Sequence, residues 1–129
     1  MELIADTNIF LAVALEEPEK AQILRLTVGA ELAAPEILPY EIGNALSAMC
    51  KRRQLSPEQA IAVQQVTGQI PVRLIAIDVG KALKLALNFN IYAFDAYFLE
   101  CARLRASPLI TLDQRMKQTA RKSGIEIVE

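Results

Sequence analysis

The sequence contains no histidine, and this absence excludes several kinds of active site. Ser-His-Asp and Cys-His catalysis, histidine zinc sites and imidazole acid–base chemistry all need that residue. Only two cysteines are present, Cys50 and Cys101, and they form no C-x-x-C motif, which excludes thiolate zinc sites and thioredoxin-type redox motifs. Both lie in apolar stretches, and we expect them to be reduced core thiols of a cytoplasmic protein.

Other classes of protein are excluded by what the chain has little of. The five glycines are too scattered to form a P-loop or a G-x-G-x-x-G turn. Residues 1–6 lack the basic and long apolar regions of a signal peptide. No uninterrupted apolar run approaches the roughly 18 residues of a membrane span. Any chemistry must therefore come mainly from carboxylates, amides, hydroxyls, lysines and arginines.

The composition is that of a folded chain with one hydrophobic core. The 129 residues are 53% hydrophobic and 22% charged, with a formal net charge of −1. A disordered chain would have low hydrophobicity and high net charge. Because the length is typical of one domain, we expect residues 1–129 to form a single domain.

Short apolar runs alternate with segments of helical periodicity along the whole chain. This alternation predicts an α/β domain with a central parallel sheet of about five strands and helices on both faces. The expected strands cover residues 3–5, 31–34, 72–77, 109–111 and 125–128. The expected helices cover 9–15, 17–29, 35 or 39 to about 53, 57–69, a segment between Asp78 and the break at 88–90, 93–105 and 114–123.

Four carboxylates stand at positions where such a sheet would bind a ligand. Asp6 directly follows the first strand and Asp113 follows the fourth, while Glu41 and Asp95 lie near helix starts in apolar surroundings. Ligands of open α/β sheets bind beyond the carboxyl ends of the strands. Each acid also has a purely structural interpretation, because Asp is a favoured helix cap and Glu in a first turn suits the helix dipole.

Two of these acids share helix faces with apolar residues, which a solvated cap would not need. Asp95 shares a stripe with Phe98 and Ala102, and Glu41 flanks the face of Ile42. A half-buried carboxylate is costly unless a cation meets it, and no lysine or arginine stands beside either acid in the sequence. Mg²⁺ and Mn²⁺ prefer oxygen ligands and assist phosphoryl chemistry without histidine. The pattern therefore favours a divalent metal site.

Four segments together resemble a known family. They are Leu-Ile-Ala-Asp-Thr-Asn at 3–8, Glu-Ile-Gly-Asn-Ala-Leu at 41–46, Ala-Phe-Asp-Ala-Tyr at 93–97 and Leu-Ile-Thr-Leu-Asp at 109–113. In this order and spacing the chain resembles the PIN-domain ribonucleases, and among them the VapC-type toxins of prokaryotic toxin–antitoxin pairs. The resemblance covers nearly the whole chain. It implies a metal-dependent endoribonuclease that hydrolyses phosphodiester bonds in RNA.

The resemblance also implies a set of site residues. One Mg²⁺ or Mn²⁺ ion would be held by Asp6 and Asp95, with Glu41 and Asp113 binding directly or through water. A second ion is left open, because no further acid follows Asp113 before Glu126. The remaining candidates are polar supports of the acids and basic side chains for the RNA: Asn8, Thr111, Arg115 and Lys117.

Aromatic side chains lie next to the acids in the sequence. Base stacking on these rings is one interpretation, and packing in the core is the commoner role that we favour here. We also expect Glu100, on the helix of Asp95, to be exposed. The rings concerned are Tyr40, Tyr92, Phe94 and Tyr97.

The first two helices carry more apolar side chains than one face can bury. Exposed apolar surface is commonly an interface, and the resemblance implies a homodimer and a groove for a small antitoxin protein. The residues concerned are Phe10, Leu11, Leu15, Leu24 and Leu26, with Ile61 and Val66 on the helix at 57–69.

Two other functions remain open at this stage. The chain could be a phosphoacceptor domain, which also places Asp after its first strand, but position 8 is Asn where a D-x-D pair needs Asp. It could also be a protein-binding module without catalytic activity, whose Asp residues are helix caps. Divalent metal binding that depends on Asp6 separates a nuclease from a capped module.

Overall fold

A parallel sheet forms the centre of the computed structural model, which describes all residues from Met1 to Glu129. The strand order is β3-β2-β1-β4, and Ile4 in β1 pairs with Ala33 on one side and Leu109 on the other. The predicted last strand is reduced to one parallel bridge between Leu109 and Ile127. The strands are β1 (Glu2–Ala5), β2 (Glu31–Pro35), β3 (Arg73–Ile75) and β4 (Leu109–Ile110).

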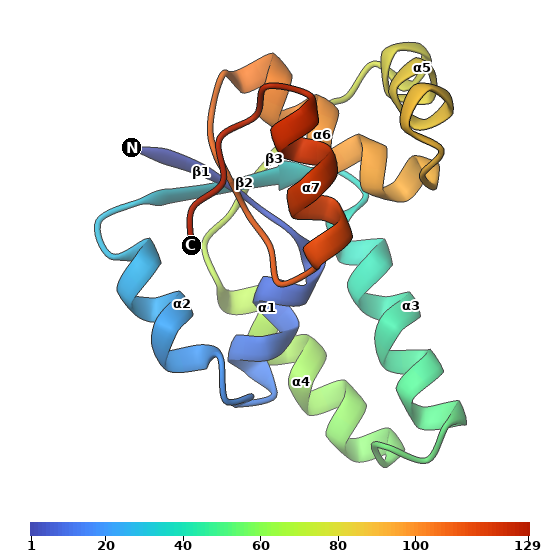
Figure 1. Cartoon of the computed structure of the whole chain (residues 1–129). Coiled ribbons are helices and arrows are strands. Elements are labelled where there is room, and N and C mark those ends of the chain that lie inside the picture. Colours follow the sequence, from blue (N-terminus) through green and yellow to red (C-terminus); the bar gives the residue numbers. More distant parts are fainter.

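Helices cover both faces of this sheet, as the sequence predicts. Figure 1 shows α1, α2 and α4 on one side of the sheet and α5, α6 and α7 on the other. The split follows from the strand order: the chain moves from β1 to β2 to β3, then returns to the other side of β1 at β4. Because crossover connections are right-handed, reversing direction moves the later helices to the opposite face. The helices are α1 (Thr7–Ala14), α2 (Lys20–Thr27), α3 (Leu38–Lys51), α4 (Pro57–Gln69), α5 (Val79–Phe89), α6 (Ala93–Arg105) and α7 (Gln114–Lys122). None of them is both long and apolar enough to cross a membrane.

Local sequence signals set several helix ends. Ser56 and Gln59 form a reciprocal capping box at the start of α4, with bonds of 2.8 and 3.1 Å. The Asp78 carboxylate accepts the backbone N–H of Lys81 and caps α5. Gly124 follows α7 with φ +77°, a conformation that glycine adopts without a Cβ clash.

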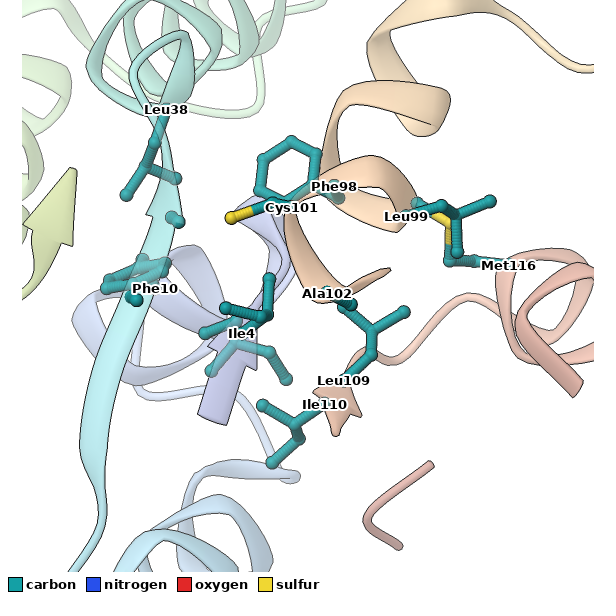
Figure 2. Packing of buried hydrophobic residues seen from close by; sticks show 14 of the residues in the cluster. Ile4, Phe10, Leu38, Phe98, Leu99, Cys101, Ala102, Leu109, Ile110 and Met116 are labelled. Carbon is teal, nitrogen blue, oxygen red and sulfur yellow. The ribbon is translucent and has the colours of Figure 1, made fainter. Parts of the chain in front are cut away.

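The core lies between β1 and the helices on either side of it. Ile4 is fully buried, with α6 packed against β1 and β2. Figure 2 shows Phe98 and Ala102 of α6 pointing into this cluster, with Phe10 of α1 across the strands. Both cysteines are free thiols; Cys101 lies in the core, as expected, whereas Cys50 is only half-buried and does not belong to the core.

The prediction that Glu100 is exposed is wrong. Its side chain is only 2% exposed and accepts hydrogen bonds from the Arg103 guanidinium. The reason is that α6 is covered on several sides, by β1, β2 and α5, so that a helix position usually left to solvent is enclosed. Pairing with Arg103 supplies the partner that a buried carboxylate requires.

Only some of the apolar side chains predicted to be exposed on the first two helices and on α4 are exposed in the structure. Phe10 is 1% exposed and belongs to the core, so its assignment to the surface is wrong. Leu24 on α2 remains exposed, as do Ile61 and Val66 on α4. The other members of the set are half-buried: Leu11, Leu15 and Leu26.

Candidate active site

The candidate site lies where the order of the strands reverses. β1 stands between β2 and β4, and the loops that leave β1 and β4 carry Asp6 and Thr111. Side chains at the carboxyl ends of such adjacent parallel strands meet at one edge of the sheet, the usual ligand position in this kind of fold.

Asp6 is held by side chains from the first turn of α1 and from the end of β4. Its Oδ2 accepts a 2.7 Å hydrogen bond from the Thr111 hydroxyl and a 3.3 Å bond from Nδ2 of Asn8. Asn8 in turn joins α1 to the segment after β4, because its amide also contacts the Thr111 hydroxyl at 3.3 Å and accepts the backbone N–H of Leu112 at 3.2 Å. The two polar residues expected beside the acids therefore fix the position of Asp6.

Burial makes Asp6 a weaker acid than an ordinary aspartate. Its exposed fraction is 7%, and this burial raises its pKa to about 6. The hydrogen bonds from Thr111 and the Thr7 backbone lower the pKa, while the charges of Asp95 and Glu41 raise it. A carboxylate in this position gains from any cation that can reach it.

Glu41 enters the site from the first turn of α3. Its Oε2 accepts a 2.7 Å hydrogen bond from the Thr7 hydroxyl. Burial raises the pKa of Glu41, the Thr7 bond opposes this, and the charge of Asp95 adds to it. Sequence reasoning missed Thr7, and the available signal was its place directly after Asp6 at the first position of α1.

Asp95 and Asp113 face a hollow of about 360 Å³. Asp95 lies in the first turn of α6, and burial raises its pKa, with a further increase from the charge of Asp113 and a decrease from Arg115. The Asp113 carboxylate caps α7 by accepting the backbone N–H groups of Arg115 and Met116 at 2.8 and 3.1 Å.

The helix-cap interpretation applies to only part of this set. Asp6 and Asp113 do cap α1 and α7. Asp95 is not a cap, because Tyr92 occupies the cap position of α6 without a side-chain bond. Glu41 is bonded to a side chain 34 positions away rather than to its own helix end. Capping therefore leaves two of the four acids unexplained.

The four acids carry charges of the same sign. None of the four makes an ion pair, and all the ion pairs of the structure lie elsewhere. No three His, Cys, Asp or Glu side chains lie close enough together to form a ready metal-binding group. Their chemistry nevertheless fits a hard divalent cation, which prefers several carboxylate oxygens. These acids are Asp6, Glu41, Asp95 and Asp113.

The two basic candidates occupy different surroundings. Arg115 lines the hollow of Asp95 and Asp113 and lowers the pKa of Asp95 by its charge. Lys117 points elsewhere, because its ammonium pairs with Glu129 at 3.0 Å. Only Arg115 stands beside the acids as a free cationic group.

The preference for core packing of the aromatic rings is wrong for three of the four. Tyr40 is 75% exposed, Tyr92 83% and Phe94 54%. These rings stand in or before the first turns of α3 and α6, where fewer neighbouring residues cover a side chain. Tyr97 is half-buried and packs edge-on against Phe94, with ring centroids 6.0 Å apart.

Comparisons with known proteins match this chain to one family. The model of the PIN domain matches residues 3–122. A search of the curated proteins finds no match.

Several solved structures share the fold. PAE2754 from Pyrobaculum aerophilum superposes with a TM-score of 0.66 at 20% identity, covering 92% of this chain and 84% of its own. VapBC2 from Rickettsia felis, bound to a DNA fragment from its promoter, gives a TM-score of 0.69 at 16% identity, covering 100% and 98%. FitAcB from Neisseria gonorrhoeae gives 0.65 at 14% identity, covering 98% and 96%. At these identities the likeness is one of fold.

Proposed function

Because this chain belongs to the PIN-domain family, whose members are generally nucleases, we propose that it is a divalent-metal-dependent endoribonuclease. The observation that carries the proposal is that four acids near the switch point of the sheet act on one another through their charges, with no ion pair to any of them. Such a group repels itself unless a cation joins it. The acids are Asp6, Glu41, Asp95 and Asp113.

One Mg²⁺ or Mn²⁺ ion is proposed for this site. Asp6 and Asp95 would hold it, with Glu41 and Asp113 binding directly or through water. When bound, the ion would polarise a phosphoryl oxygen of the RNA and lower the pKa of a water molecule, so that hydrolysis needs no histidine. The proposal covers one ion and makes no statement about a second.

The chain's own residues orient the acids and the substrate. Thr111 and Asn8 fix the Asp6 carboxylate through bonds of 2.7 and 3.3 Å. Thr7 holds Glu41 in the same way at 2.7 Å. Bonds of this kind around ligating groups commonly decide metal affinity. Arg115, facing Asp95 across the hollow, is placed to bind a phosphate of the RNA.

We further propose that the chain is the toxin of a toxin–antitoxin pair. This rests on the VapC-like sequence segments and on the fold shared with VapBC2 and FitAcB. The partner would be a small antitoxin protein. Exposed Leu24, Ile61 and Val66 offer it apolar surface on α2 and α4. A homodimer is proposed on the same grounds.

Cleavage of a random single-stranded RNA pool tests the proposed reaction. Wild-type protein should cut the pool with Mg²⁺ or Mn²⁺ and not with EDTA, and a matched DNA pool should stay intact. Each of Asp6→Asn, Glu41→Gln, Asp95→Asn and Asp113→Asn should reduce the rate by orders of magnitude without loss of helical circular dichroism.

Asp78→Asn is the matched control, because Asp78 also caps a helix with its carboxylate but lies outside the site. It should cleave at the wild-type rate. If the Asp6 and Asp95 variants cleave as fast as this control, the acids are structural and the chain is a binding module.

A further inference from the structure

Two hollows flank the acidic centre, and each has an exposed aromatic ring at its wall. The first, here the Tyr92 hollow, has a volume of about 360 Å³ and includes Asn90, Tyr92, Asp95 and Arg115 in its lining. It lies on the side of α7. Its volume falls within the range of about 300–1,000 Å³ that is common for small-molecule sites.

The second, here the Tyr40 hollow, has a volume of about 300 Å³. Its lining includes Thr7, Tyr40, Glu41, Asn44 and Phe94, so it lies on the side of α3. Glu41 belongs to this hollow and Asp95 to the other, and the charges of these two acids act on each other. The acidic centre therefore stands between the two hollows.

Each exposed aromatic side chain of this protein lines one of these two hollows, and Tyr40 also lines a neighbouring apolar hollow with Ile77 and Tyr97. Tyr40, Tyr92 and Phe94 are the only aromatic residues among the exposed large hydrophobic side chains, although the chain has three tyrosines and four phenylalanines. These rings leave their faces open to solvent, where a ligand with flat apolar faces can stack on them. Bases of single-stranded nucleic acid stack on such rings.

Each hollow also carries a side-chain amide. Asn44 lines the Tyr40 hollow and Asn90 lines the Tyr92 hollow, and both residues are exposed. An amide donates and accepts hydrogen bonds at once, which is what recognition of a base edge requires. Each hollow therefore has an aromatic ring and a side-chain amide in its lining.

We propose that Tyr40 and Tyr92 are stacking platforms for the two nucleobases on either side of the scissile phosphate, with Asn44 and Asn90 reading the base edges. This inference rests on the proposed ribonuclease function and assigns its sequence preference to two hollows. The phosphate between the bases would lie at the acids, and Arg115 would contact a phosphate in the Tyr92 hollow.

Binding of a fluorescein-labelled single-stranded RNA pool to the metal-free protein gives a test that does not depend on cleavage. Tyr40→Ala and Tyr92→Ala should each weaken binding about tenfold, within the range that stacking on one ring contributes. Tyr40→Phe and Tyr92→Phe should bind as the wild type does, because the ring is kept. Leu104→Ala is the control, since Leu104 is an exposed apolar side chain of α6 that lines neither hollow. Unchanged binding in both alanine variants would overturn the proposal.

A double-mutant cycle that combines the tyrosine variants with abasic substrates identifies which ring contacts which base. The wild-type cut is first mapped in one oligonucleotide, and the base on its 5′ or 3′ side is then replaced by an abasic site. Removing a base should raise the KM of the wild type about tenfold and should have no added effect in the variant that lacks its ring. Each tyrosine should pair with one side of the cut. Additive losses for all four combinations of ring and base would contradict stacking. Stacking would also be contradicted by a protein partner that covers both rings while RNA binding stays unchanged.

The outcomes separate this inference from the proposed function. RNA binding that depends on Tyr40 and Tyr92 without any metal-dependent cleavage would contradict the nuclease and keep the base sites. Cleavage that depends on the acids but not on the rings would keep the nuclease and overturn the base sites.

Discussion

The hydroxyl of Thr111 donates a 2.7 Å hydrogen bond to Oδ2 of Asp6, joining residues that are 105 positions apart in the chain. The same oxygen of Thr111 accepts the backbone N–H of Asp113 at 3.1 Å. One threonine thus connects the ends of β1 and β4 and two of the four acids. The orientation of the site depends on this contact between neighbouring parallel strands.

Replacing Thr111 by valine should weaken metal binding while keeping the fold. The valine has a similar shape but cannot donate to Asp6, so we expect Mn²⁺ affinity to fall about 10–100-fold, as is usual for residues that orient ligands. Isothermal titration with Mn²⁺ measures this. Thr67→Val is the matched control, because Thr67 is also buried but bonds to its own helix at Gln64. Equal affinities in the two variants would show that Thr111 does not orient the site.

Asp6 should destabilise the metal-free protein at neutral pH. Its pKa in the fold is about 6, above the ordinary value of 3.8. A raised folded-state pKa means that its contribution to stability is complete below pH 3.8 and is lost as pH rises through 6. In EDTA, the free energy of unfolding of Asp6→Asn should therefore increase relative to that of the wild type as pH rises through this range, by up to about 3 kcal/mol at pH 7. Urea unfolding of both proteins at several pH values measures this difference in stability. A stability advantage of Asp6→Asn that shrinks as pH rises would contradict the prediction.

The capping box of α4 should affect stability alone. Ser56 accepts the N–H of Gln59 at 3.1 Å, at the start of a helix that carries none of the four acids. Ser56→Ala should lower the free energy of unfolding by about 1 kcal/mol, because it leaves that N–H without its partner. The rate of RNA cleavage should stay at the wild-type value. A large loss of cleavage in a folded Ser56→Ala protein would show that α4 takes part in the reaction.

The chain should be a dimer in solution. Exposed leucines, valines and isoleucines remain on several helices, including Leu24 on α2 and Leu87 on α5. Light scattering at tens of micromolar should give a mass twice the 14.2 kDa of one chain. A strict monomer at that concentration would refute the dimer.

The sequence predicts the order of elements because local signals are strong in this chain. The capping box at Ser56, the cap at Asp78 and the left-handed turn at Gly124 act through neighbouring residues and can be recognised without tertiary information. The strand before Asp6 is apolar and short, as a buried parallel strand should be. The position of Asp6 at the carboxyl end of β1 follows from those features.

Residues whose surroundings come from distant parts of the chain could not be predicted in this way. Glu100 is buried because β1, β2 and α5 enclose α6 from several sides, and helix periodicity does not report how many sides are covered. Tyr40 and Tyr92 look like core residues in the sequence but stand at helix starts beyond the sheet. The bond from Thr7 to Glu41 spans 34 positions and leaves no trace in either local segment.

Binding of Mn²⁺, followed by the electron paramagnetic resonance of the free ion, tests the central claim most directly. The claim is that four acids at the end of the sheet form one divalent metal site. Wild-type protein and Asp78→Asn should each bind one Mn²⁺ per chain, and Asp6→Asn and Asp95→Asn should lose that ion while remaining folded. Wild-type protein that binds no Mn²⁺, or folded Asp6 and Asp95 variants that bind it as the wild type does, would contradict the account.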